Sequence, residues 1–225
     1  MSIAENWHKI QTVIAACTSQ PVQVVAVTKT RSPDDIRKVI AAGAAVLGEN
    51  RVEEARTKFL DRGLLKEFPH VSLHMIGHLQ TRKVRDAVEL FNCIQSLDSV
   101  KLAREINARC DSISKIMAVM IEVNVSGEKQ KYGISPADTP NLVREVLSLP
   151  HLRLTGLMTM APYTDDQTML RKTFGGLLNL KNSLSAGLGA DHFTILSMGM
   201  SNDYRIAIEE GSTMLRIGSA IFEEL

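Results

Sequence analysis

The stretch VVAVTKTRSPDD at residues 24–35 decides the fold. Its short apolar run is typical of a buried strand, and the run ends just before Lys29. Ser32 is a preferred helix N-cap, Pro33 suits the first helical position, and the two aspartates that follow suit the first turn. The stretch therefore predicts a strand, a lysine, a short loop and a helix, which is the unit from which parallel α/β proteins are built.

The same alternation of apolar runs and amphipathic segments continues along the chain. We expect strands at residues 22–27, 45–47, 71–77, 93–97, 115–124, 152–160, 193–198 and 214–217. Helical segments are expected from the Ser32 N-cap to near Gly43, over 51–66, through Lys83 and Arg85, over 100–109, from residue 135, and over 169–188. Eight strands favour a closed (β/α)8 barrel, although an open doubly wound sheet would show the same alternation. We expect a single domain over residues 1–225, with an extra N-terminal helix that covers the bottom or edge of the barrel.

The composition excludes several classes of protein. The 225 residues are 44% hydrophobic and 23% charged, which is enough apolar material for a sizeable core. The net charge is +1 and aromatic residues are 4%, so nothing favours binding to nucleic acid or to a membrane surface. The three cysteines show no CxxC spacing, and no apolar leader opens the sequence. We therefore expect a cytoplasmic protein without a disulfide framework.

The position of Lys29 gives the first indication of chemistry. In parallel α/β folds, the carboxyl ends of the strands carry the functional side chains. An amine partly withdrawn from water can react in its neutral form, and a neutral amine attacks aldehydes to form Schiff bases. A solvated lysine that simply follows a strand would give the same pattern, so Lys29 alone leaves both interpretations open.

Two segments that contain glycine and serine lie at the ends of the last two expected strands. They are SMGMS at residues 197–201 and RIGS at residues 216–219. Small residues let backbone N–H groups approach an anion, and the loops after strands 7 and 8 of a barrel frequently hold phosphate. Either segment alone could be a tight turn. Together, opposite a strand-end lysine, they favour a phosphorylated aldehyde such as pyridoxal 5′-phosphate, while a sugar phosphate on a barrel aldolase would use the same groups.

Six segments occur in an order that resembles a known family. They are AVTKT at residues 26–30, GENRVEEA at 48–55, HMIGHLQTRK at 74–83, LTGLMTM at 154–160, LSMGMSND at 196–203 and RIGSAIF at 216–222. They span nearly the whole chain and are similar to the YggS/PROSC family of pyridoxal phosphate homeostasis proteins. The resemblance implies a barrel like the N-terminal domain of alanine racemase, which is the fold-type III pyridoxal phosphate architecture.

The resemblance also implies which residues bind the cofactor. They are Lys29, Asn50, Ser197, Arg216, Gly218 and Ser219. Lys29 would carry the cofactor as a Schiff base, the two serines and Gly218 would bind its phosphate, and Asn50 would lie near its ring. Arg216 would face the pyridine nitrogen. Because an arginine does not give up its proton, the ring nitrogen would stay unprotonated and carbanion chemistry would be restrained.

The function that the resemblance implies is intracellular vitamin B6 homeostasis. The protein would buffer pyridoxal 5′-phosphate or deliver it to client enzymes, as a monomer with no catalytic residue and no metal. A pyridoxal phosphate-dependent amino-acid racemase is the alternative, with Lys29 as one base and Tyr132 or Tyr163 as the second. A racemase of this kind needs a second base from another domain, and we expect no second domain here.

Three further features of the sequence carry less weight. His70, His74 and His78 are evenly spaced, but on an extended strand the outer two lie too far apart for one metal ion, so His78 is expected to line the pocket instead. The chain departs from the family pattern at Arg82, where asparagine is common, and at Glu223, where glycine is common.

Overall fold

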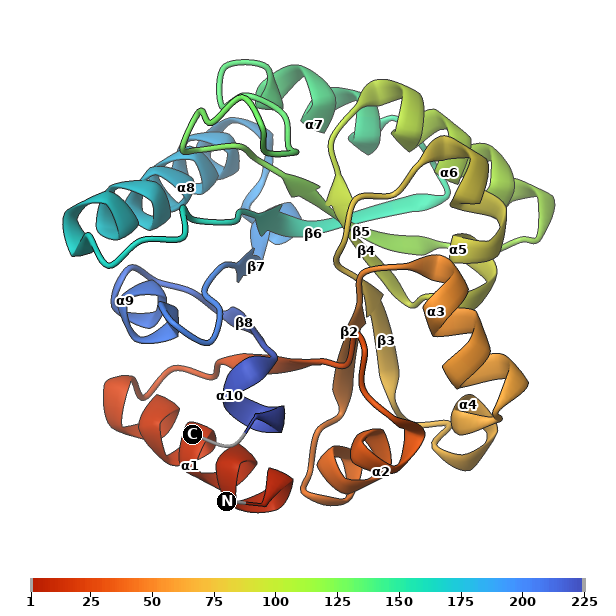
Figure 1. Cartoon of the computed structure of the whole chain (residues 1–225). Helices are drawn as coiled ribbons and strands as arrows, with labels where there is room; N and C mark the ends of the chain where they lie inside the picture. The colour runs from red at the N-terminus through yellow and green to blue at the C-terminus, as the bar shows by residue number, and fades with distance from the viewer. Residues whose placement is uncertain (1, 224–225) are drawn as a thin grey trace.

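The computed structural model describes residues 2–223 and shows a closed barrel of eight parallel strands (Figure 1). The strands are β1 Gln23–Val27, β2 Val46–Glu49, β3 Ser72–Met75, β4 Cys93–Leu97, β5 Met117–Glu122, β6 Leu152–Met158, β7 Ile195–Ser197 and β8 Met214–Ile217. Each strand pairs with the next, and β1 closes the ring by pairing with β8, so that Val25 lies opposite Arg216. The expected (β/α)8 barrel is confirmed, and an open sheet is excluded. Residues 1, 224 and 225 of the expected domain lie outside the described residues.

A ring of helices surrounds the barrel. It contains α1 Ile3–Cys17, α2 Pro33–Ala41, α3 Val52–Arg56, α4 Leu64–Glu67, α5 Val84–Leu90, α6 Val100–Ser112, α7 Thr139–Leu147, α8 Gln167–Leu188, α9 Tyr204–Glu209 and α10 Ser219–Phe222. Shorter turns complete it, namely the π-helical turn η1 Thr57–Asp61 and the 3₁₀ turns η2 Thr81–Lys83 and η3 Ala190–Phe193. The expected N-terminal helix is α1, which packs against α2, α9 and α10 and therefore covers the edge of the barrel. Asn6 of α1 donates a hydrogen bond to the carbonyl of Ile221, 3.1 Å away, and so ties α1 to α10.

The stretch that predicted the fold forms the expected strand and helix. Four of the five residues of β1 are buried, as a strand packed on both faces requires. The hydroxyl of Ser32 caps α2 by accepting a hydrogen bond from the backbone N–H of Asp35 at 3.2 Å. Lys29 therefore lies in a short connection between two well-defined elements.

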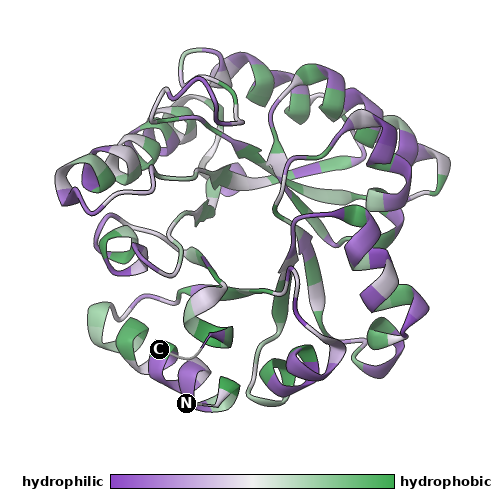
Figure 2. Ribbon diagram, viewed as in Figure 1, coloured by the Kyte–Doolittle hydropathy of each residue, from purple (hydrophilic) through white to green (hydrophobic). Residues whose placement is uncertain are grey.

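The core has two layers. Most buried apolar side chains lie between the strands and the helices, while a smaller cluster fills the barrel interior with Val25, Val46, Cys93, Met120, Met158 and Met214. Figure 2 shows the same division, with largely hydrophobic strands and helices that alternate between hydrophobic and hydrophilic positions. The filled interior leaves the carboxyl ends of the strands as the place for a site.

Two expected helices differ from the structure. The segment 51–66 is divided into α3, η1 and α4, because Gly63 adopts a left-handed conformation with φ of 76° between η1 and α4. The helix expected from residue 135 begins at Thr139, since Ser135 and Asp138 form a turn in which the Ser135 hydroxyl accepts from the N–H of Asp138. By contrast, α8 runs unbroken through its glycine pair. A Cβ atom at Gly176 would lie 2.8 Å from Val125, so this glycine allows close packing.

Candidate functional site

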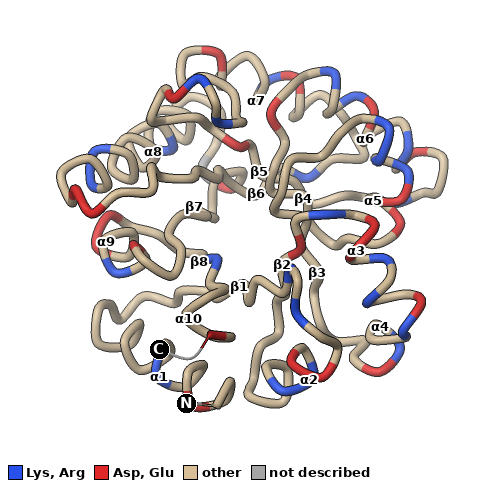
Figure 3. The backbone as a smooth tube through the Cα atoms, viewed as in Figure 1, with Lys and Arg blue, Asp and Glu red and all other residues tan. Residues whose placement is uncertain are grey.

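A cavity of about 780 Å³ opens at the carboxyl ends of the strands. Its walls include residues that follow β1, β2, β3 and β8. The sequence-predicted residues that line it are Lys29, Asn50, His78, Arg216, Gly218 and Ser219, together with Tyr132 and Tyr163, the candidate bases of the racemase alternative. Figure 3 shows that charged residues of both signs otherwise lie mainly on the outer helices and loops. The folded chain therefore gathers five of the six predicted cofactor-binding residues, together with His78, around one cavity.

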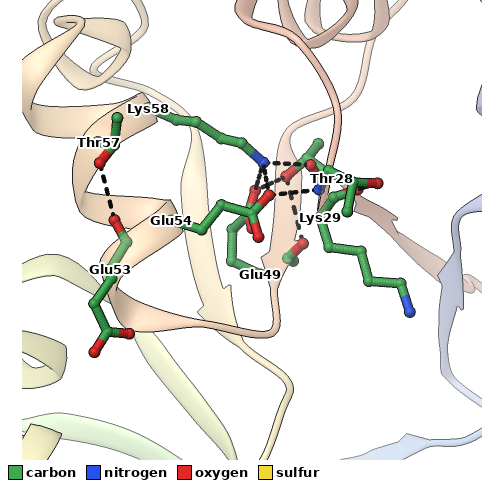
Figure 4. Close-up of polar contacts among 9 residues, drawn as sticks. Thr28, Lys29, Glu49, Glu53, Glu54, Thr57 and Lys58 are labelled. Atoms are coloured by element: carbon green, nitrogen blue, oxygen red, sulfur yellow. Dashed lines mark hydrogen bonds and ion pairs between the residues drawn. The ribbon is translucent and has the colours of Figure 1, made fainter.

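Lys29 reaches the cavity from a tight turn that follows β1. The N–H of Arg31 donates to the carbonyl of Thr28 at 3.0 Å, so that Lys29 and Thr30 occupy the two central positions of the turn. Thr30 has a positive φ of 63°, which is unfavourable for a β-branched residue. Lys29 itself is exposed. Figure 4 shows its side chain extending away from the neighbouring charged side chains of Glu49, Glu54 and Lys58. Its amine is thus accessible to a small molecule in the cavity.

The adjacent wall is formed by the loops that follow β7 and β8, and β8 lies next to β1 in the barrel. The hydroxyl of Ser201 accepts hydrogen bonds from the backbone N–H groups of Gly218, at 3.3 Å, and Ala220, at 3.2 Å. Ser201, Gly218 and Ser219 all line the cavity. Backbone N–H groups and hydroxyls gathered in this way are the donors that bind phosphate oxygens. This wall has the composition expected of the phosphate cup that the two glycine-and-serine segments predict, and phosphate binding there stays a prediction.

Ser197 lies elsewhere than predicted. It is fully buried in β7 and does not line the cavity. Its hydroxyl donates to Gln95 at 2.6 Å and accepts from a guanidinium N–H of Arg216 at 2.7 Å. Because its hydrogen-bonding capacity is used inside the barrel, the serine available to a phosphate is Ser201, in the loop four residues further on. The segment 197–201 contains both serines. The expected strand ends at residue 198, so it includes Ser197 and leaves Ser201 in the loop, and this difference is the sequence signal that distinguishes them.

Arg216 is a buried cation at the floor of the cavity. Its guanidinium donates to the hydroxyl of Ser197 and, at 2.8 Å, to the carbonyl of Thr159. Burial lowers the pKa of Arg216 to about 10, while the nearby carboxyl groups of Glu122 and Asp203 act in the opposite direction. Arg216 therefore remains a proton-bearing cation at neutral pH, held by neutral oxygen atoms.

Glu122 is a cavity residue that the sequence interpretation missed. It ends β5, lines the cavity and is 5% exposed. Burial raises the pKa of Glu122 to about 7, against the lowering effect of Arg216 and with a further rise from Asp98. A lone acid within the apolar run MAVMIE was the available signal, since glutamate is rarely buried without a reason.

The remaining side of the cavity is formed by the residues after β2 and β3. A Cβ atom at Gly77 would lie 2.4 Å from the carbonyl oxygen of Asn50, so only glycine permits this close approach of the two loops. The ring of His78 stacks on Tyr132 with centroids 3.9 Å apart, and its Nδ1 lies 3.3 Å from the carboxylate of Asp98. His78 lines the cavity as predicted, held between an aromatic ring and an acid.

Within residues 2–223, no three histidine, cysteine or acidic side chains come together in a way that could hold a metal ion. In the same part of the chain, no helix is both long enough and apolar enough to cross a lipid bilayer.

Known proteins are similar to this chain in fold and in sequence. The sequence profile of the alanine racemase N-terminal domain matches residues 1–224. The pyridoxal phosphate homeostasis protein of Pasteurella multocida is 36% identical over 99% of this chain and 97% of its own length. The structure of PipY from Synechococcus elongatus with pyridoxal phosphate bound has a TM-score of 0.87 and 30% identity, and the match covers 98% of this chain and all of PipY. An alanine racemase of Clostridium difficile shares the fold at a TM-score of 0.81 and 14% identity, and this chain covers 57% of it.

These matches show that the barrel belongs to the class of alanine racemase N-terminal domains. Within that class, the relative from Pasteurella multocida is a pyridoxal phosphate homeostasis protein, and this chain belongs to the same family.

Proposed function

We propose that this protein binds pyridoxal 5′-phosphate through Lys29 and takes part in intracellular vitamin B6 homeostasis, by buffering the cofactor or delivering it to client enzymes. The observation that carries the proposal is one cavity with an amine on one wall and phosphate-type donors on the other. The printed names of the relatives, and the cofactor in the PipY structure, support it. The proposal includes a single cytoplasmic domain that acts as a monomer.

The donors that line the cavity fit this cofactor. Bound pyridoxal 5′-phosphate supplies an aldehyde that condenses with an amine and a ring that withdraws electrons. Lys29 is the amine, and Ser201, Gly218 and Ser219 replace the predicted set as the phosphate-binding residues. Arg216 lines the cavity and keeps its proton at neutral pH, which suits an unprotonated ring nitrogen. Asn50 lies on the third side of the cavity and would contact the ring.

The proposal of binding without turnover is supported by the two tyrosines considered as a second base. The ring of Tyr132 is stacked on His78, and Tyr163 is 92% exposed. Both line the cavity, but both side chains are exposed, and among the described residues neither is held by a hydrogen bond that would position it as a proton-transfer partner. Loaded protein should therefore leave the chirality of every amino acid unchanged, whereas steady racemisation would favour the alternative enzyme.

The decisive experiment is a covalent trap. Wild type, Lys29→Ala and Lys38→Ala, an exposed lysine on α2, are mixed with pyridoxal 5′-phosphate and reduced with borohydride. The amine nitrogen bonds to the aldehyde carbon, the carbonyl oxygen leaves as water, and reduction fixes the bond. We expect a pyridoxyl-phosphate mass on Lys29 in wild type and Lys38→Ala, and none at that site in Lys29→Ala. A wild type that remains colourless and unlabelled would overturn the proposal.

A further inference from the structure

A buried ion cluster lies directly behind Lys29 (Figure 4). The ammonium group of Lys58, which is 7% exposed, donates to the carboxylate of Glu49 at 3.0 Å and to that of Glu54 at 2.6 Å. Glu49 is fully buried and also accepts a hydrogen bond from the hydroxyl of Thr28 at 2.7 Å. A buried cluster of this kind is costly unless every member has a partner, so its position next to the turn of Lys29 needs an explanation.

The cluster holds the two peptide groups that flank Lys29. On one side, Lys58 donates to the carbonyl oxygen of Thr28 at 2.7 Å. On the other side, the backbone N–H of Thr30 donates to the same Glu54 oxygen that accepts from Lys58. One ion pair therefore fixes both ends of the residue whose amine enters the cavity, without touching the amine itself.

The turn needs such support because its backbone is strained. Thr30 adopts a positive φ, a conformation that suits glycine or asparagine and disfavours a β-branched residue. Strained backbone persists only where the surrounding structure holds it in place, and it gathers at functional sites. The contacts to Lys58 and Glu54 are those that hold this turn.

The charges of the cluster are suited to this task. Burial would raise the pKa of Glu54, but the hydrogen bonds from Lys58 and Thr30 outweigh burial and leave that pKa below its ordinary value. Glu54 thus stays ionised and accepts strongly from the turn. Lys58 lies one turn further along, in the π-helical segment η1, a widened turn that is frequent at functional sites.

We propose that Lys58 and Glu54 are positioning residues that hold the strained turn Thr28–Arg31 and so aim the amine of Lys29 at a phosphorylated aldehyde in the cavity. The inference rests on the proposed function, because it concerns how Lys29 meets its ligand. The N–H groups of Gly218 and Ala220 on the adjacent wall are held by Ser201, and in the described part of the chain Lys58 and Glu54 make no hydrogen bond to them. Loss of the ion pair should therefore weaken the bond to Lys29 while it leaves the phosphate cup intact.

The first test compares Glu54→Ala with Glu53→Ala. The two glutamates are neighbours on α3, but Glu53 is exposed and pairs with Lys83 instead of the turn. Each protein is stripped of cofactor and mixed with pyridoxal 5′-phosphate, and the adduct on Lys29 is followed by visible absorbance and by borohydride trapping. We expect Glu54→Ala to slow adduct formation by about 10- to 100-fold, as misplacement of a reacting group does, and Glu53→Ala to match wild type.

A second ligand separates positioning from general damage. Pyridoxamine 5′-phosphate has the same ring and phosphate but carries an amine in place of the aldehyde, so it cannot bond to Lys29. Its affinity for Glu54→Ala, measured by calorimetry, should equal that for wild type. Equal weakening of both ligands, or adduct formation at the wild-type rate, would overturn the positioning role.

Variants of Lys58 test the other half of the pair. Lys58→Met should show the same selective loss, and Lys58→Arg, which keeps the charge, should recover part of the rate. Since Lys58→Met could fail to fold, its melting temperature is measured first. If it is unfolded, the comparison of Glu54→Ala with Glu53→Ala alone tests the positioning role. A wild type that forms no adduct would defeat the proposed function and this inference together, whereas a normal wild type with a normal Glu54→Ala defeats only the inference.

Discussion

The two walls of the cavity solve different problems with different groups. On the β1–β2 side, a buried cation with two carboxylates holds a strained turn, and the functional group is a long flexible side chain. On the β7–β8 side, the groups are backbone N–H donors and hydroxyls, and the buried cation Arg216 is bonded to a hydroxyl and a carbonyl. A flexible amine has to be aimed by its backbone, whereas an anion can be bound by the backbone itself. We call the β1–β2 side the lysine wall and the β7–β8 side the phosphate wall. The comparison predicts that the lysine wall is sensitive to changes of buried charge and that the phosphate wall is sensitive to loss of a single hydrogen-bond donor.

The largest effect is expected when the charge cluster of the lysine wall is broken. Lys58→Met leaves Glu49 and Glu54 without their cation, and removal of one partner from a buried pair costs about 3–5 kcal/mol of unfolding free energy. Urea denaturation at neutral pH measures the loss. Adding Glu49→Gln to Lys58→Met should restore part of it, because one of the two carboxylates left without a cation is then replaced by a neutral group.

The control for this stability effect lies on the surface. Lys83→Met breaks only the exposed pair with Glu53 and should leave the unfolding free energy unchanged within error. If Lys58→Met were as harmless as Lys83→Met, the cluster would not be an organising feature of the lysine wall.

Much of the fold could be predicted from the sequence because local signals and burial agree. The N-cap at Ser32 and the apolar run before Lys29 form as expected, and eight such runs close into a barrel. The segment 51–66 could not be predicted in detail. Its division depends on Gly63 and on the tertiary contacts of Lys58, which leaves its helix to reach the turn after β1. Helical propensity alone contains no information about that reach.

The candidate site shows the same limit. Lys29, Gly218 and Ser219 could be found because residues at the ends of parallel strands meet at one face of the barrel. The choice between Ser197 and Ser201 depended on where β7 ends, which is the least certain part of a sequence-based assignment. Glu122 was hidden in an apolar run, and its raised pKa arises from burial, which follows from the folded structure and not from the sequence pattern.

A smaller effect is expected from the buried acid beside the phosphate wall. Burial raises the pKa of Glu122 from its ordinary 4.5 to about 7, so the folded state binds more protons than the unfolded state between these values. The contribution of Glu122 to stability is therefore fully present below about pH 4.5 and is lost as the pH rises through about 7. Glu122→Gln removes this dependence and should be more stable than wild type at pH 8 by up to about 3 kcal/mol. Thermal unfolding from pH 4 to 8 measures the difference, and parallel curves for the two proteins would contradict the shift.

The smallest effect sharpens the comparison most, because it concerns one hydroxyl on the phosphate wall. Ser201→Ala leaves the N–H groups of Gly218 and Ala220 without their shared acceptor and removes a donor from the cup. Loss of one such contact should weaken pyridoxal 5′-phosphate and pyridoxamine 5′-phosphate alike, by about tenfold. Glu54→Ala, on the other wall, should weaken only the ligand with an aldehyde.

Ser197→Ala is the matched control. The hydroxyl of Ser197 is bonded to Gln95 and Arg216, so its removal should not alter the affinity for phosphate. Calorimetry with inorganic phosphate distinguishes the two serines directly. If Ser197→Ala weakened phosphate and Ser201→Ala did not, the phosphate cup would have to be moved from the loop into the barrel, and the contrast between the two walls would fail.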